Sequence, residues 1–185
     1  MIFPVDPKGF LPAVEWRTRE AFLSLAGKFQ RETGLSLQVR SGRRTCAEQN
    51  ALYAQGRAEG GDVVTHASGC RSWHVTGRAI DANVLLPSGS VSTNEADYAY
   101  AGALWKRQGG VWGGDFPGFW DGGHFELHPG LSIADVCPSD VSCDAIAMAV
   151  TTKTPLYAQM AVPFWGSILG AAAYIGWMKW KRKRP

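Results

Sequence analysis

The apolar positions of the chain repeat with two different periods, and these periods predict where helices and strands lie. Residues 13–33 carry apolar side chains at helical intervals and Gly34 follows them as a stop signal, so we expect an amphipathic helix there. Residues 35–40 alternate apolar and polar side chains, which predicts a half-buried strand. A second strand is expected at residues 79–85, where the chain is apolar and rich in β-branched side chains.

Two sequence patterns of the capping-box type predict the starts of two further helices. Thr45 with Glu48 opens a short helix that runs to Gly56. Ser92 with Glu95 opens another helix, which a pair of glycines closes. Both helices are shorter than the first one.

The remaining pattern predicts a single α+β domain. Residues 112–130 are too rich in glycine for a helix, and we expect only a short strand in their HFEL segment. Short strands between helices, without a regular alternation of strand and helix, are typical of α+β folds. We expect this domain to cover residues 1–150, followed by a linker over residues 151–160.

The C-terminal part of the chain predicts a transmembrane helix at residues 161–180. Residues 161–178 carry no charge, and as a helix they would rise about 27 Å, close to the ~30 Å thickness of a bilayer core. The basic tail at 181–185 favours a cytoplasmic C-terminus. Gly166 and Gly170 have the spacing of helix pairs in membranes, which indicates a homodimer. A buried core helix is the alternative.

The net charge of +3 does not indicate a nucleic-acid-binding protein. Five of the 19 basic residues lie in the last seven positions: Lys179, Lys181, Arg182, Lys183 and Arg184. Without these five, 14 basic residues stand against 16 acidic ones. A nucleic-acid partner would require a basic face on the folded domain, and the composition predicts none.

Cysteine usage predicts an oxidising compartment. The four cysteines, Cys46, Cys70, Cys137 and Cys143, allow three disulfide pairings, and their spacing fits no zinc-finger pattern. We expect the pairs Cys46–Cys70 and Cys137–Cys143. Four buried thiols in a cytoplasmic protein are the alternative.

Two short segments combine histidine and aspartate at spacings that core packing does not require. His74 precedes Asp81 by seven residues, and Asp121 precedes His124 by three across two glycines. Zinc binds imidazole nitrogen and carboxylate oxygen, and a catalytic site keeps its fourth position for water. We therefore expect His74, Asp81 and His124 to bind one Zn²⁺, with Asp121 as the general base.

Two polar residues near these segments are candidates for contacts with substrate. Arg44 has the geometry to stabilise an oxyanion or to bind a substrate carboxylate, although it could instead pair with a surface acid. Ser72 could hold substrate or only cap the turn before His74. His66 and His128 are interpreted as histidines with ordinary structural partners.

Six motifs occur in an order that resembles a known enzyme family: SGRRTCAEQ, LYAQGR, VVTHASG, SWHVTGRAID, WGGDF and DGGHFEL. They resemble the zinc peptidases of the VanY-like D-alanyl-D-alanine carboxypeptidase family, and most of all its L-alanyl-D-glutamate endopeptidase branch, which includes phage endolysins. The resemblance spans roughly residues 35–128. It implies a small antiparallel sheet flanked by helices, as in the hedgehog signalling domain.

The same resemblance implies a role for each candidate residue. His74, Asp81 and His124 would bind zinc, and Asp121 would be the catalytic base. Arg44 and Ser72 would contact the substrate or the oxyanion. If Cys46 and Cys70 are paired, their bridge would tie the helix after Arg44 to the zinc-binding loop.

These observations predict a membrane-anchored zinc peptidase that cuts peptidoglycan stem peptides at the L-Ala–D-Glu bond. A D-alanyl-D-alanine carboxypeptidase is the alternative enzyme, and a zinc-containing wall-binding module without hydrolysis is the alternative of another class. The domain is expected to face the periplasm or cell wall, although the first residues lack the pattern of a signal peptide. A viral protein in a virion membrane would meet the wall without ordinary secretion.

Overall fold

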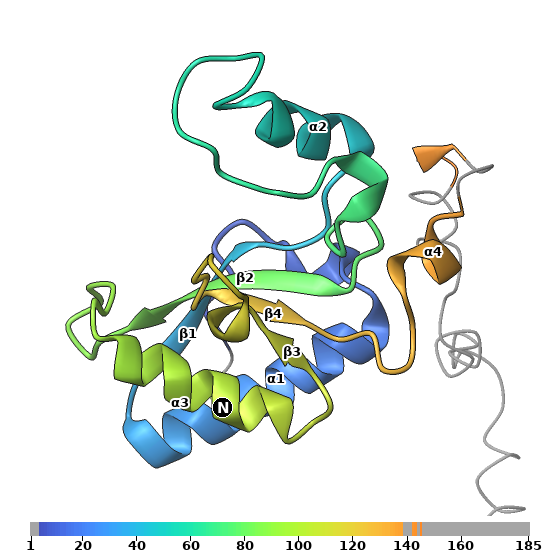
Figure 1. The fold of residues 1–185 in the computed structure, drawn as a ribbon. Coiled ribbons are helices and arrows are strands. Elements are labelled where there is room, and N and C mark those ends of the chain that lie inside the picture. Colours follow the sequence, from blue (N-terminus) through green and yellow to red (C-terminus); the bar gives the residue numbers. More distant parts are fainter. Residues whose placement is uncertain (1–3, 139–141, 144, 146–185) are drawn as a thin grey trace, which may run out of the picture. The chain divides into compact units, whose positions relative to one another are not determined.

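The computed structural model describes residues 4–138, 142–143 and 145, which form an α+β domain (Figure 1). Its centre is a four-stranded antiparallel sheet in the order β1-β2-β4-β3. The strands are β1 (Ser36–Ser41), β2 (Ala79–Leu85), β3 (Val111–Trp112) and β4 (His124–Glu126). The small antiparallel sheet flanked by helices is thus confirmed.

Helices lie on both sides of this sheet. Among the described residues, the α-helices are α1 (Trp16–Thr33), α2 (Cys46–Ala54), α3 (Glu95–Lys106) and α4 (Ile133–Val136). Three short 3-10 helices accompany them: η1 (Leu11–Ala13), η2 (Gly69–Arg71) and η3 (Gly113–Asp115). Figure 1 shows α1 and α3 together below the sheet and α2 above it.

Alternation along β2 explains why the two faces of the sheet differ. Ile80, Ala82 and Val84 are fully buried in the hydrophobic core, together with side chains of α1 and α3. Because successive side chains of a strand point to opposite faces, Asp81 lies on the face away from this core. The sheet therefore has one apolar face that holds the fold together and one polar face that is available for chemistry.

The limits of α1 follow from its caps. The Glu15 carboxylate accepts hydrogen bonds from the backbone N–H groups of Arg17 and Thr18, and this starts the helix at Trp16. Gly34 ends it in the left-handed conformation with φ +74°. The predicted helix and its stop are confirmed, with a start three residues later than expected.

One of the two predicted capping boxes forms. Thr45 accepts a hydrogen bond from the N–H of Glu48, whose carboxylate accepts one from the N–H of Thr45, so α2 starts as expected. The box of Ser92 and Glu95 is wrong. Asn94 caps α3 instead by accepting from the N–H of Ala96, while the Ser92 hydroxyl donates to Asp97.

All four cysteines form disulfides, but the predicted pairing is wrong. The bridges are Cys46–Cys143 and Cys70–Cys137, with Cα–Cα distances of 5.9 and 5.8 Å. Asn50 of α2 accepts a hydrogen bond from the N–H of Gly69, which brings Cys46 near Cys70 as expected. The sulfur atoms of Cys46, Cys70 and Cys143 all lie within 4.8 Å of one another. Although Cys46 and Cys70 lie close together, each is bonded to a cysteine of the segment that follows α4.

Within the described part of the chain, no helix has the length and apolar character that crossing a bilayer requires. The predicted span at 161–180 lies outside the described residues. So do the linker at 151–160, the basic tail at 181–185, and the glycines at 166 and 170. All of these stay predictions.

Candidate active site

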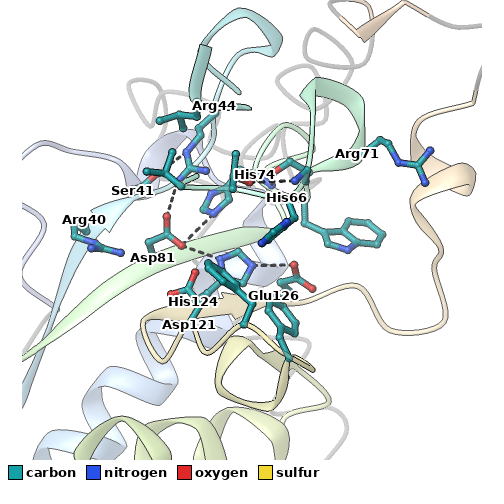
Figure 2. Close-up of a pocket in the computed structure, with 18 of the residues that line it drawn as sticks. Arg40, Ser41, Arg44, His66, Arg71, His74, Asp81, Asp121, His124 and Glu126 are labelled. Atoms are coloured by element: carbon teal, nitrogen blue, oxygen red, sulfur yellow. Dashed lines mark hydrogen bonds and ion pairs between the residues drawn. The ribbon is translucent and has the colours of Figure 1, made fainter. Parts of the chain in front are cut away.

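Two strands and one turn bring the three predicted metal ligands together (Figure 2). Asp81 of β2 lies directly opposite His124 of β4 in the antiparallel register. His74 belongs to the turn before β2, which closes at Gly77 with φ +70° and a hydrogen bond from the Gly77 N–H to the His74 carbonyl. Glycine suits this turn because it adopts positive φ without strain.

The ligand atoms of these residues converge on one point. His74 Nε2 lies 3.2 Å and His124 Nδ1 lies 2.8 Å from Oδ1 of Asp81. One potential metal-ligand atom of each residue lies within 4.8 Å of those of the other two, and all three side chains are buried. The trio is therefore able to hold a metal ion.

The outer ring nitrogen of each histidine is already engaged. Nδ1 of His74 donates to the Gly42 carbonyl oxygen at 2.6 Å, and Nε2 of His124 donates to Oε1 of Glu126 at 2.8 Å. In the neutral rings that bind a metal, these bonds favour the tautomers whose inner nitrogens carry the lone pairs. Such partners are typical of metal-binding histidines in proteins.

Arg44 holds the other side of Asp81. Its Nη2 lies 2.5 Å from Oδ2 of Asp81, while Nε donates to Ser41 at 3.0 Å and Nη1 donates to Gln49 at 3.1 Å. Gln49 is fully buried and donates in turn to the Ala67 carbonyl. The observed contacts thus give Arg44 a role in orienting Asp81, and its contact with substrate stays a prediction.

Asp121 and Ser72 lie in the same cavity as the trio. The N–H of His124 donates to the Asp121 carbonyl at 3.1 Å, which turns the Asp121 side chain toward the cluster (Figure 2). Ser72 is buried, and its hydroxyl accepts from the N–H of His74 at 3.3 Å. Ser72 therefore shapes the turn that carries His74, and it also reaches the cavity wall.

Burial and charge set the protonation of these groups. Burial raises the pKa of Asp121, and the nearby His124 partly opposes this. Burial would also raise the pKa of Asp81, but His74 and His124 hold it well below its usual range. Burial lowers the pKa of His124, yet its bonds to Asp81 and Glu126 raise it to about 10. The His124 and His128 bonds overcome burial and lower the pKa of Glu126 to about 2.

The cavity around the cluster has a volume of about 640 Å³. Phe116 and Phe119 from the loop before β4 supply apolar walls, together with Leu52 and Val64. Three arginines line it as well: Arg40, Arg44 and Arg71. The site is thus open to solvent, partly apolar and rich in positive charge.

Sequence reasoning missed Glu126 and Arg40. Glu126 follows His124 by two positions on one strand, so the alternation of β4 places both on the same face, and this signal was available. Its second carboxylate oxygen accepts from His128 at 3.0 Å, so His128 has a structural partner as predicted. Arg40 follows the buried Val39 on β1, so alternation places it on the face of the site, and this signal was available as well.

Known proteins share the motifs and the fold. Residues 65–127 match the model of a family described as D-alanyl-D-alanine carboxypeptidase. The chain is 33% identical over 105 residues to the peptidoglycan L-alanyl-D-glutamate endopeptidase CwlK of Bacillus subtilis. This match covers 52% of the chain and 63% of CwlK, so the chain spans less than two thirds of that relative.

A solved structure supports the fold independently. The L-Ala D-Glu endopeptidase ChiX of Serratia marcescens superposes with a TM-score of 0.51 at 23% identity, over 69% of this chain and 90% of ChiX. The LdcB LD-carboxypeptidase reaches a TM-score of 0.48 at 17% identity, over 72% of this chain and 67% of that protein, which is too low to support an inference. The chain is thus similar to D-alanyl-D-alanine carboxypeptidases over residues 65–127, and its fold is similar to that of ChiX.

Proposed function

We propose that this protein is a zinc-dependent peptidase that hydrolyses the L-Ala–D-Glu bond of peptidoglycan stem peptides. The observation that carries this proposal is the convergence of His74, Asp81 and His124 in one cavity that Asp121 also lines. The identity to CwlK supports the choice of bond.

The donor set favours zinc as the metal. Two imidazole nitrogens and one carboxylate oxygen are common ligands of Zn²⁺, and three protein ligands leave a position open, as in catalytic zinc sites. When bound, zinc would supply a nucleophile at neutral pH and polarise the scissile carbonyl. The hydrogen bonds from His74 to Gly42 and from His124 to Glu126 hold both rings in position for it.

Asp121 supplies the proton transfers. Its carboxylate takes a proton from the attacking water and later gives it to the leaving nitrogen as the C–N bond breaks. Burial raises its pKa above the usual range of an aspartate, which is the direction that suits a group acting first as base and then as acid. Arg44 and Ser72, both at the cavity wall, are proposed to contact the substrate or the oxyanion.

Removal of a terminal D-Ala is the second candidate, because the matching family model is described as a D-alanyl-D-alanine carboxypeptidase. A zinc-containing binding module without hydrolysis has no use for the carboxylate of Asp121 beside the metal. Purified muropeptides incubated with the zinc-loaded protein separate these functions. We expect cleavage between L-Ala and D-Glu; release of D-Ala with that bond intact would support the second candidate, and binding without products the third.

We also propose that the domain works outside the cytoplasm, anchored by the apolar segment at 161–180. The two disulfides support an oxidising compartment, and the basic tail supports a cytoplasmic C-terminus. Protease added to spheroplasts that carry the full-length chain should digest the domain and leave the tail protected. A domain that resists protease until the membrane is broken would contradict this orientation.

A further inference from the structure

Strand β1 contains one residue too many for regular pairing with β2. Val39 pairs with Ala82 and Ser41 pairs with the next residue, Asp81, so Arg40 stands opposite no partner of its own. Two residues against one is the definition of a β-bulge, which redirects a side chain and is frequent beside active sites.

Alternation after Val39 places Arg40 on the polar face of the sheet, and the bulge brings Ser41 to that face beside it. Arg40 and Ser41 both line the cavity, whereas Val39 is buried in the core on the other face. Nη2 of Arg40 lies 3.8 Å from the position that a Cβ on Gly123 would occupy. The guanidinium thus lies near Gly123, which precedes His124, and on the Asp121 side of the cluster (Figure 2).

Arg40 differs from Arg44 in having no hydrogen-bond or ion-pair partner among the described residues. Arg44 uses its guanidinium nitrogens on Asp81, Ser41 and Gln49. Among the described residues, the Arg40 side chain has neither a hydrogen bond nor an ion pair, and it is exposed to solvent in the cavity. Its planar fork of N–H donors suits a carboxylate that comes from outside the protein.

We propose that Arg40 binds the free α-carboxylate of the residue on the leaving side of the scissile bond; this rests on the proposed peptidase function. Asp121 delivers its proton to the leaving nitrogen, and the α-carboxylate is attached to the carbon next to that nitrogen. A substrate whose nitrogen lies at Asp121 therefore has this carboxylate within reach of the neighbouring Arg40.

This contact separates stem peptides from ordinary peptides. In an ordinary internal peptide bond, the carboxyl group next to the leaving nitrogen is used in the following amide and carries no charge. A D-Glu residue that continues the chain through its γ-carboxyl keeps a free α-carboxylate, and so does a C-terminal D-Ala. Arg40 would thus favour substrates with a free α-carboxylate next to the leaving nitrogen, a feature that both candidate bonds share.

Matched substrates test the proposal. The zinc-loaded protein is given L-Ala-γ-D-Glu-L-Lys and the same peptide with the D-Glu α-carboxylate converted to a carboxamide. A second pair ends in D-Ala-D-Ala with a free or an amidated C-terminus and covers the other candidate bond. We expect kcat/KM to be about 10- to 100-fold higher for the carboxylate form of the cleaved pair, as charged hydrogen bonds suggest.

Arg40→Gln should remove most of this preference. Its kcat/KM should fall about 10- to 100-fold on the carboxylate substrate and less than about threefold on the amide, each measured at the pH optimum of the variant. Arg40→Lys should keep part of the preference because it keeps the charge. Arg71→Gln is the matched control: it also removes one cavity arginine, but on the opposite side of the cluster, and should keep the ratio between the substrates.

The outcomes distinguish a failure of the role proposed for Arg40 from a failure of the proposed peptidase function. If the wild-type protein cleaves both forms equally, or if Arg40→Gln slows both by the same factor, Arg40 does not read the carboxylate, although the peptidase function stands. If the zinc-loaded wild type cleaves neither pair, the peptidase function itself fails, and the role of Arg40 fails with it.

Discussion

Glu126 connects His124, one of the candidate metal ligands, to His128 near the surface of the domain. Its carboxylate accepts from His124 on one side and from His128 on the other, and His128 stacks on Trp73 with ring centroids 3.9 Å apart. We expect Glu126→Ala to weaken zinc binding by about 10- to 100-fold, because carboxylate partners orient metal-binding histidines. Competition with a chromogenic chelator measures the affinity. Glu126→Gln keeps an acceptor for His124 and should recover part of the loss; unchanged affinity in the alanine variant would contradict this role.

Measuring metal content and activity on the same samples should distinguish a metal-ligand residue from the general base. His74→Ala removes a ligand, so it should lose bound zinc and some stability, since metal binding is coupled to folding. Asp121→Ala should keep its zinc and lose about 10²- to 10⁴-fold in kcat, the usual contribution of a general base. Substantial activity in Asp121→Ala would show that another group accepts the proton.

The pH profile of kcat/KM should show how the positive charge of Arg40 affects the pKa of Asp121. The Arg40 guanidinium lowers the pKa of Asp121, against the larger effect of burial. A carboxylate with a higher pKa stays protonated to higher pH, and a protonated base is inactive. The acid limb of kcat/KM should therefore move to higher pH in Arg40→Gln. The metal charge is the same in both proteins and cancels in the comparison, and Arg71→Gln should leave the limb in place.

Two helical glycines should respond oppositely to alanine. In α3, a Cβ on Gly102 would overlap the indole ring of Trp112, whereas in α1 a Cβ on Gly27 would meet only the flexible end of Arg31 at 3.3 Å. Alanine ordinarily gains about 0.5–1 kcal/mol over glycine inside a helix. Gly27→Ala should therefore keep or raise the melting temperature. Gly102→Ala should lower it, since overpacking costs about 1–3 kcal/mol. Equal shifts would mean that Trp112 moves aside freely.

The elements that the sequence predicted well are those with a local cause. The limits of β2 and the start of α2 depend on patterns within a few residues, and both were confirmed. The cap of α3 was missed because Ser92 and Asn94 both fit a cap, and the bond from Ser92 to Asp97 decides between them. The bulge at Arg40 depends on how β1 pairs with a strand some 40 residues later, which local alternation cannot show.

The residues of the candidate site were likewise predictable where short, local motifs contain them. His74 and Asp81 belong to one turn and strand, and the spacing between Asp121 and His124 is equally local, so short motifs reveal them. The bond between Arg44 and Asp81 and the convergence of Glu126 with His128 arise only in the folded sheet. The residue types of the motifs indicated the chemistry, but the residues that orient the motif side chains could be identified only from the structure.

The two disulfides should be visible in peptide mapping and in stability. Non-reducing digests of the oxidised protein should join the Cys46 peptide to that of Cys143, and the Cys70 peptide to that of Cys137. The bridges span 97 and 67 residues, and loops of this length are worth about 4 kcal/mol each in the chain-entropy model. The double variant Cys46→Ser with Cys143→Ser should lower the free energy of unfolding accordingly. A linked Cys46–Cys70 peptide would contradict the structure.

The nested order of these bridges has a consequence for biosynthesis. Cys46 and Cys70 are synthesised well before Cys137 and Cys143, and the fold places their sulfur atoms near each other. In an oxidising compartment that receives the chain from its N-terminus, the first bond to form is therefore the non-native Cys46–Cys70. The thiol of Cys143 then attacks Cys46 and releases the thiol of Cys70, and the oxidant joins Cys70 to Cys137 as the second native pair. Maturation of this domain thus needs an exchange step in addition to an oxidant, and a chain oxidised before Cys143 is available would keep its first two cysteines joined.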